Sequence, residues 1–193
     1  MRYLVVYAHP VGDSFVAALH QCVVKALREA GHTVDDCDLN AEGFQPVLSE
    51  AERRAYHDVG ANRASIEKDV ERLTNCEGLV LVFPTWWYGM PAILKGYIDR
   101  VWVPGVAFKL QGGRTLPLLH NITRFVVVTT YGSPWWLNKL IGDPNRSALM
   151  RGIRMLYAPG ARTLWLAQYG MDDITAEKRE RFLRKVERKL RGF

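Results

Sequence analysis

The sequence has few cysteines and no long apolar run. Cys22, Cys37 and Cys76 are the three cysteines, and no two of them form a C-x-x-C pair. An odd number at such wide spacing is neither a disulfide framework nor a zinc site, so we expect small buried side chains, a reducing compartment and no bound metal. No stretch approaches the ~20 apolar residues that cross a bilayer. The short apolar start before His9 is typical of a core strand rather than a signal peptide, and we expect a cytoplasmic protein without stable membrane insertion.

Several phosphate-binding motifs are also missing. No G-x-G-x-x-G follows the first apolar run, so the dinucleotide fingerprint is absent. A Walker A motif fails because Leu94 stands where its second glycine is required. The first loop carries Ala8-His9-Pro10 in place of an acidic cluster, which excludes a phospho-receiver domain.

Much of the net charge of +6 lies in the C-terminal segment, but nothing there indicates nucleic-acid binding. Its lysines and arginines are interleaved with three glutamates, Glu177, Glu180 and Glu187, and with apolar residues at helical spacing. This pattern is typical of a solvated helix that packs by one apolar stripe. A weak attraction for anionic ligands such as NADPH is the alternative.

Short apolar, β-branched runs alternate with helical patterns along the whole chain. The apolar runs are residues 3–8, 78–83, 124–130 and 163–168, with a weaker candidate at 33–37. The helical patterns cover residues 14–30, 64–75, 91–101, 147–156 and 175–190. This alternation predicts a parallel sheet with helices on both faces, and we interpret residues 1–193 as a single α/β domain.

In such a fold, ligands bind outside the carboxyl ends of the strands, and three loops of this chain should meet there. The first loop, residues 8–15, runs from a strand into a helix. Its backbone N–H groups, the Ser14 hydroxyl and a cationic His9 are suited to holding a phosphate. A simple helix cap at Ser14, with His9 on the surface, explains the same residues equally well.

The second loop contains three consecutive aromatic residues, Trp86, Trp87 and Tyr88. Neighbouring side chains diverge, so the three cannot all enter one core and some must face the site. A rigid aromatic turn suits a planar ligand such as a flavin ring, because oriented backbone amides stabilise the negative charge that the ring gains on reduction. An aromatic cluster for packing or for a dimer contact is the alternative.

The third loop, residues 129–136, supplies threonine and serine hydroxyls, a glycine and a pair of tryptophans. The hydroxyls are suited to bonding a ring edge or a ribityl chain. The tryptophans Trp135 and Trp136 would either wall a substrate pocket or pack against a second subunit.

Residues 83–102, FPTWWYGMPAILKGYIDRVW, closely resemble the signature of the NAD(P)H:quinone oxidoreductases with a flavodoxin-like fold. That family includes the DT-diaphorase type and the ancillary flavoproteins of bacterial potassium-efflux systems. Ala8-His9-Pro10 with Ser14-Phe15, residues 105–108 and the Thr129-Thr130 loop match it as well. The resemblance implies a flavodoxin-like three-layer sandwich, with a five-stranded parallel sheet in the order 2-1-3-4-5 and helices on both faces.

The resemblance also implies an activity and an assembly. The protein would be a homodimer with one flavin, FAD or FMN, in each subunit. A hydride would pass from NAD(P)H to the flavin, and two electrons would then pass to a quinone or similar acceptor at the same pocket, in ping-pong fashion. The alternative is a non-catalytic flavoprotein, acting as the regulatory subunit of a transporter or as an electron carrier; the basic charge argues against the carrier.

Carried over by position, the family's cofactor-binding residues fall in the three loops. His9, Ser14 and Phe15 would hold the phosphate side of the flavin. The ring would rest on the second loop, and its other edge would face the third. These two sets are Pro84, Thr85, Trp86, Trp87 and Tyr88, and Thr129, Thr130, Tyr131 and Gly132.

The chain departs from the family at several positions. Val16 replaces an asparagine that often follows the phenylalanine, and Tyr131 interrupts a glycine pair. The DT-diaphorase type uses a tyrosine and a histidine as a charge relay, yet no histidine follows His120 here. Such a role falls to Tyr131 or Tyr88, our candidate catalytic residues, or is absent.

Overall fold

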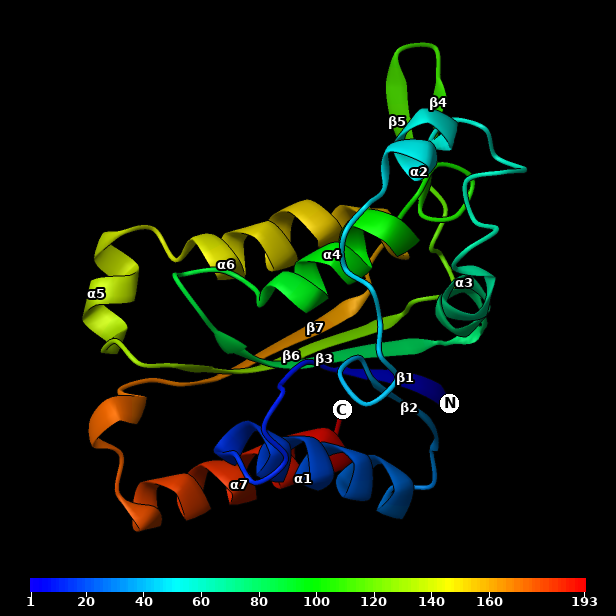
Figure 1. The fold of residues 1–193 in the computed structure, drawn as a ribbon. Helices are drawn as coiled ribbons and strands as arrows, with labels where there is room; N and C mark the ends of the chain where they lie inside the picture. Colours follow the sequence, from blue (N-terminus) through cyan, green and yellow to red (C-terminus); the bar gives the residue numbers. More distant parts are fainter.

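A five-stranded parallel sheet lies between two layers of helices in the computed structural model, which describes residues 1–193 (Figure 1). The strand order is β2-β1-β3-β6-β7, and all four pairings are parallel. Numbered within this sheet, that is the predicted order 2-1-3-4-5, and the flavodoxin-like prediction is confirmed. The strands are β1 (Arg2–Tyr7), β2 (Thr33–Asp38), β3 (Gly78–Thr85), β6 (Arg124–Tyr131) and β7 (Arg162–Gln168).

The sheet divides the hydrophobic core into two parts, each covered by helices. α1 (Phe15–Glu29) and α7 (Ala176–Arg191) lie side by side on one face of the sheet (Figure 1). The other face is covered by α3 (Glu67–Asn75), α4 (Ala92–Val101) and the segment that begins with α6 (Pro144–Ser147). Because both faces are covered, β3 and β6 are almost continuous apolar runs. No helix is both long enough and apolar enough to cross a membrane.

The helices α1 and α7 begin at capping side chains, and α1 is followed by a glycine. The Ser14 hydroxyl accepts a hydrogen bond from the Ala17 N–H at 3.1 Å, and Thr175 caps α7 in the same way. Gly31 follows α1 with φ of +81°, a left-handed conformation that glycine adopts without strain. The first cap matters for function because it fixes where α1 starts, directly after the loop that carries His9.

An antiparallel hairpin and one short helix were not predicted from the sequence. β4 (Phe108–Gln111) and β5 (Arg114–Pro117) form an antiparallel hairpin that stands away from the main sheet (Figure 1). Gly112 and Gly113 form its turn with φ of +58° and +73°, and this pair was the available signal. The short helix that was not predicted is α5 (Trp135–Leu140). A second short helix, α2 (Glu50–Ala55), lies in the connection between β2 and α3, where the sequence has a helix-like run over residues 49–56. After α6 the chain continues through a π-helical turn (Ala148–Gly152) and a 3-10 turn (Ile153–Leu156).

Candidate functional site

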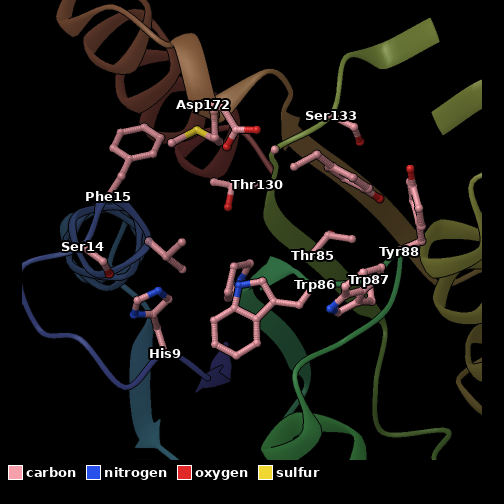
Figure 2. A pocket seen from close by; sticks show the side chains of 15 residues that line it. His9, Ser14, Phe15, Thr85, Trp86, Trp87, Tyr88, Thr130, Ser133 and Asp172 are labelled. Carbon is pink, nitrogen blue, oxygen red and sulfur yellow. The ribbon is translucent and has the colours of Figure 1, made fainter. Parts of the chain in front are cut away.

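A cavity of about 710 Å³ lies at the carboxyl ends of β1, β3 and β6. The chain runs from β1 outward to β2 and then returns to β3 on the other side of β1, so the cavity lies where the strand order reverses. Figure 2 shows the lining side chains around a common space. They are His9, Ser14, Phe15, Val16, Pro84, Thr85, Trp86, Trp87, Tyr88, Thr130, Tyr131, Gly132, Ser133, Met171 and Asp172.

One side of the cavity is built by the start of α1. His9 and Ser14 lie there together, as predicted, with Phe15 beside them (Figure 2). The Val11 N–H donates to Nδ1 of His9 at 3.0 Å, which orients the imidazole ring toward Trp86, with their ring centroids 5.9 Å apart. The first N–H groups of α1 have no partner within the helix, and the helix dipole adds positive potential there. This side is suited to an anionic group.

The opposite side is a tight aromatic turn. Trp86 and Gly89 exchange two backbone hydrogen bonds, with N···O distances of 3.1 and 2.9 Å. The two residues between them, Trp87 and Tyr88, have φ of +49° and +61°. Positive φ at both central positions is the geometry of a type I′ turn, which favours asparagine and glycine because larger residues are strained there.

This strain is informative because the same chain builds a comparable turn without it. Gly112 and Gly113 supply positive φ at the tip of the β4–β5 hairpin. At the cavity the equivalent positions hold a tryptophan that is 98% exposed and a tyrosine that is half-buried. A strained backbone that presents exposed aromatic side chains beside a cavity indicates a binding role.

The third loop places some of its predicted residues at the cavity and one beneath it. Thr130 and Gly132 line the cavity. Thr129 does not: it is fully buried, and its hydroxyl lies 2.9 Å from that of Thr85. The prediction of a direct ligand contact for Thr129 is therefore corrected: its side chain is buried within β6, before the end of the strand that reaches the cavity. It braces Thr85, which also accepts a hydrogen bond from the Asn145 side chain at 2.9 Å.

Tyr131 is buried, and its hydroxyl has a protein partner. It donates a hydrogen bond to Oδ1 of Asp143 at 3.0 Å. Its ring stacks on Tyr169, with centroids 4.6 Å apart. Burial, reinforced by the negative charge of Asp143, raises the pKa of Tyr131 above its usual value. The phenol therefore keeps its proton and acts as a donor to Asp143.

Three lining residues, Met171, Asp172 and Val16, were not predicted as ligand contacts. Met171 and Asp172 lie in the loop after β7, and extending the carboxyl-end rule to that last strand would have found them. Asp172 approaches Gly132 so closely that a Cβ there would lie 3.2 Å from either carboxylate oxygen. Val16 is the third, and Ser133, whose hydroxyl was expected at the site, also lines the cavity. Trp135 and Trp136 do not line the cavity; they project from α5 and are exposed.

The comparisons with known proteins are consistent with this geometry. The family model for proteins with a flavodoxin-like fold matches residues 1–185. An "Uncharacterized NAD(P)H oxidoreductase" of Haemophilus influenzae is 36% identical over 126 residues, which cover 63% of this chain and 60% of that protein. NAD(P)H dehydrogenase (quinone) 1 of Rattus norvegicus is 30% identical over 162 residues, which cover 75% of this chain and 59% of that protein. The matches span about 60% of the length of these curated relatives.

Two solved structures resemble the chain over nearly its full length. Smu.1420 from Streptococcus mutans UA159 superposes with a TM-score of 0.87 at 32% identity and covers 100% of both chains. The NAD(P)H:quinone oxidoreductase from Methanothermobacter marburgensis gives a TM-score of 0.81 at 27% identity and covers 99% of this chain and 96% of that one.

We expect the strained aromatic turn to lower the stability of the fold and to raise its affinity for a planar ligand. In a Trp87→Asn/Tyr88→Gly double variant the turn becomes Asn-Gly, which accepts positive φ at both positions. We expect the free energy of unfolding, measured by urea denaturation, to rise by roughly 1 kcal/mol as the backbone strain is relieved. Affinity for a planar ligand such as FMN, measured by fluorescence titration, should fall.

The matched control is Gly112→Asn, which also creates an Asn-Gly turn but lies in the hairpin away from the cavity. It should leave both quantities nearly unchanged. A double variant that is less stable than the parent, or that binds FMN equally well, contradicts a binding role for this turn.

Proposed function

The chain belongs to the family of proteins with a flavodoxin-like fold, and on this premise we propose that it is a flavin-dependent NAD(P)H oxidoreductase that reduces a quinone-like acceptor. The observation that carries the proposal is one cavity that joins an anion-favouring helix start to a flat aromatic turn. The names of the Haemophilus influenzae, rat and Methanothermobacter marburgensis relatives support the reaction class.

The residues present fit a flavin. A cavity of about 710 Å³ is within the usual range for a cofactor site. The start of α1, with Ser14 and His9, would hold the phosphate. Trp86 and the turn beyond it would flank the ring, and Thr130 with the Gly132 backbone would reach its polar edge. FMN and FAD share these groups, so the same residues serve either cofactor.

When bound, a flavin would accept a hydride from NAD(P)H and pass two electrons to a quinone, which becomes a quinol by gaining two protons in all, one of them from solvent. The protein's part is to orient the reactants and exclude water. If both reactants use this one cavity beside the aromatic turn, NAD(P)⁺ would leave before the acceptor enters. This order is the ping-pong mechanism.

The first experiment is an absorbance spectrum of the purified protein reconstituted with FMN or FAD, recorded before and after anaerobic addition of NADPH or NADH. We expect a flavin spectrum that bleaches promptly and returns when a soluble quinone is added. Chromatography of the released cofactor identifies FMN or FAD. A protein that binds neither flavin would overturn the proposal, and one that bleaches but does not reoxidise with quinone would favour a non-catalytic flavoprotein.

The two candidate catalytic tyrosines differ in their surroundings. The Tyr131 hydroxyl is engaged by Asp143, whereas Tyr88 is half-buried at the cavity and its hydroxyl makes no hydrogen bond within the protein. We therefore assign Tyr88 the role of donating a hydrogen bond to the acceptor oxygen and Tyr131 that of a wall. Tyr88→Phe should slow quinone-dependent reoxidation about tenfold or more and spare reduction by NAD(P)H, as followed by stopped-flow absorbance. Equal slowing of both half-reactions would contradict this assignment.

The exposed aromatic side chains near the cavity favour a second copy of the chain as partner. Trp87 is 98% exposed, and Trp135, Trp136 and Leu140 are exposed on α5. Apolar groups gathered in this way commonly mark an interface. Sedimentation equilibrium should give twice the 22.0 kDa of one chain, and a Trp135→Glu/Trp136→Glu variant should shift the mass toward one chain. A parent protein that sediments as one chain at micromolar concentration would contradict the homodimer.

A further inference from the structure

We propose that Asp143 is a positioning residue that lowers the reduction potential of the flavin by holding a buried negative charge behind the Tyr131 wall of the cavity; this inference rests on the proposed function. The segment that contains Asp143 had no role in the sequence analysis. It folds back against the carboxyl ends of β3 and β6, where Asp143 contacts Tyr131 and Asn145 contacts Thr85.

The carboxylate is buried and incompletely satisfied. Asp143 is 4% exposed, and only its Oδ1 accepts a hydrogen bond, from the Tyr131 hydroxyl. Its Oδ2 has no hydrogen-bond partner. The nearest cation is Lys139, whose Nζ lies 4.0 Å from Oδ2 and whose side chain is 40% exposed. Burying a carboxylate oxygen without a hydrogen bond is costly, so its presence beside a cavity points to function.

The backbone fixes the position of this carboxylate. Asp143 has φ of +46°, a left-handed conformation that among non-glycine residues only aspartate and asparagine adopt with ease. Its N–H donates to the Asn138 carbonyl at 2.8 Å, and its carbonyl accepts from the Ser147 N–H at 2.9 Å. The stacking of Tyr169 on Tyr131 holds the other partner of the pair.

The position of the charge gives its effect a definite sign. Tyr131 lines the cavity and Asp143 accepts a hydrogen bond from its hydroxyl, so the Tyr131 side chain lies between the carboxylate and the cavity that would hold the flavin. Reduction adds negative charge to a flavin, and a nearby carboxylate disfavours that charge through a poorly screening interior. Lys139 offsets part of the effect. Arg146 and Arg151 line a second cavity, of about 310 Å³, that Asp143 also borders.

The test compares two variants that should shift the potential in opposite directions. Asp143→Asn keeps the left-handed backbone and an oxygen that accepts from Tyr131, but removes the charge, so the potential should rise. Lys139→Met removes the offsetting cation and keeps an aliphatic stem, so the potential should fall. We expect each shift to change the ratio of reduced to oxidised flavin about tenfold at a given potential, which corresponds to about 30 mV for two electrons.

The potential is read from flavin absorbance during anaerobic equilibration with a reference dye, and the Kd for FMN is measured on the same proteins. Opposite shifts at nearly constant Kd support the inference, because a merely structural role would weaken binding without reversing the sign. Unchanged potentials in both variants overturn it. If Asp143→Asn fails to fold, Lys139→Met alone decides: a fall supports the inference and no change overturns it. A parent protein that binds no flavin overturns the proposed function itself, which is a separate result.

Discussion

Helices cover both faces of the parallel sheet, and the rest of the molecule follows from that burial. Strands β1, β3 and β6 are buried over nearly their whole length, and their central residues are apolar. Functional groups are therefore confined to the ends of the strands, where the chain leaves the core. At the carboxyl ends the strand order reverses between β1 and β3, so their two loops diverge and leave the cavity between them. The core thus decides where a ligand can bind.

The rigid core also lets the protein tolerate strain at the cavity. Trp87 and Tyr88 hold positive φ in a turn that directly follows the buried strand β3. Two backbone hydrogen bonds between Trp86 and Gly89 fix the base of this turn. Asp143 also has positive φ, which aspartate tolerates better than an aromatic residue does, and it is held by hydrogen bonds to Asn138 and Ser147. In both places the conformation costs stability and presents a particular side chain at or behind the cavity. The backbone conformation that these residues prefer differs from the one that the fold imposes on them, and this difference occurs where function is expected.

The parts of the site that could be predicted from the sequence are those formed by residues close together along the chain. Ser14 and the aromatic turn are recognisable because capping residues and aromatic runs follow apolar strands directly, and the strand order followed from the resemblance carried by the turn and its helix. The Asn145–Thr85 and Tyr131–Asp143 hydrogen bonds were not predictable in this way, since they join separate loops through tertiary packing. Thr129 was misplaced for a related reason: alternation along β6 turns neighbouring side chains to opposite faces, and a loop motif does not show where the strand ends. The β4–β5 hairpin was not predicted because its strands are only four residues long and largely exposed, so they lack the apolar pattern of a buried strand.

Charge acts on two length scales in the proposed function. The net charge of +6 is largely on the surface, where salt screens it beyond about 8–10 Å, so it can draw in an anionic dinucleotide but cannot tune chemistry inside the cavity. Asp143 has the opposite sign and is buried, so screening weakens it far less. In the proposed function, a basic surface would favour binding of the anionic NAD(P)H. The buried carboxylate of Asp143 would favour transfer of electrons from the reduced flavin to the acceptor. Because these effects act at different distances, the surface could change its charge without altering the potential, whereas a change at Asp143 or Lys139 would alter the potential and leave capture nearly intact.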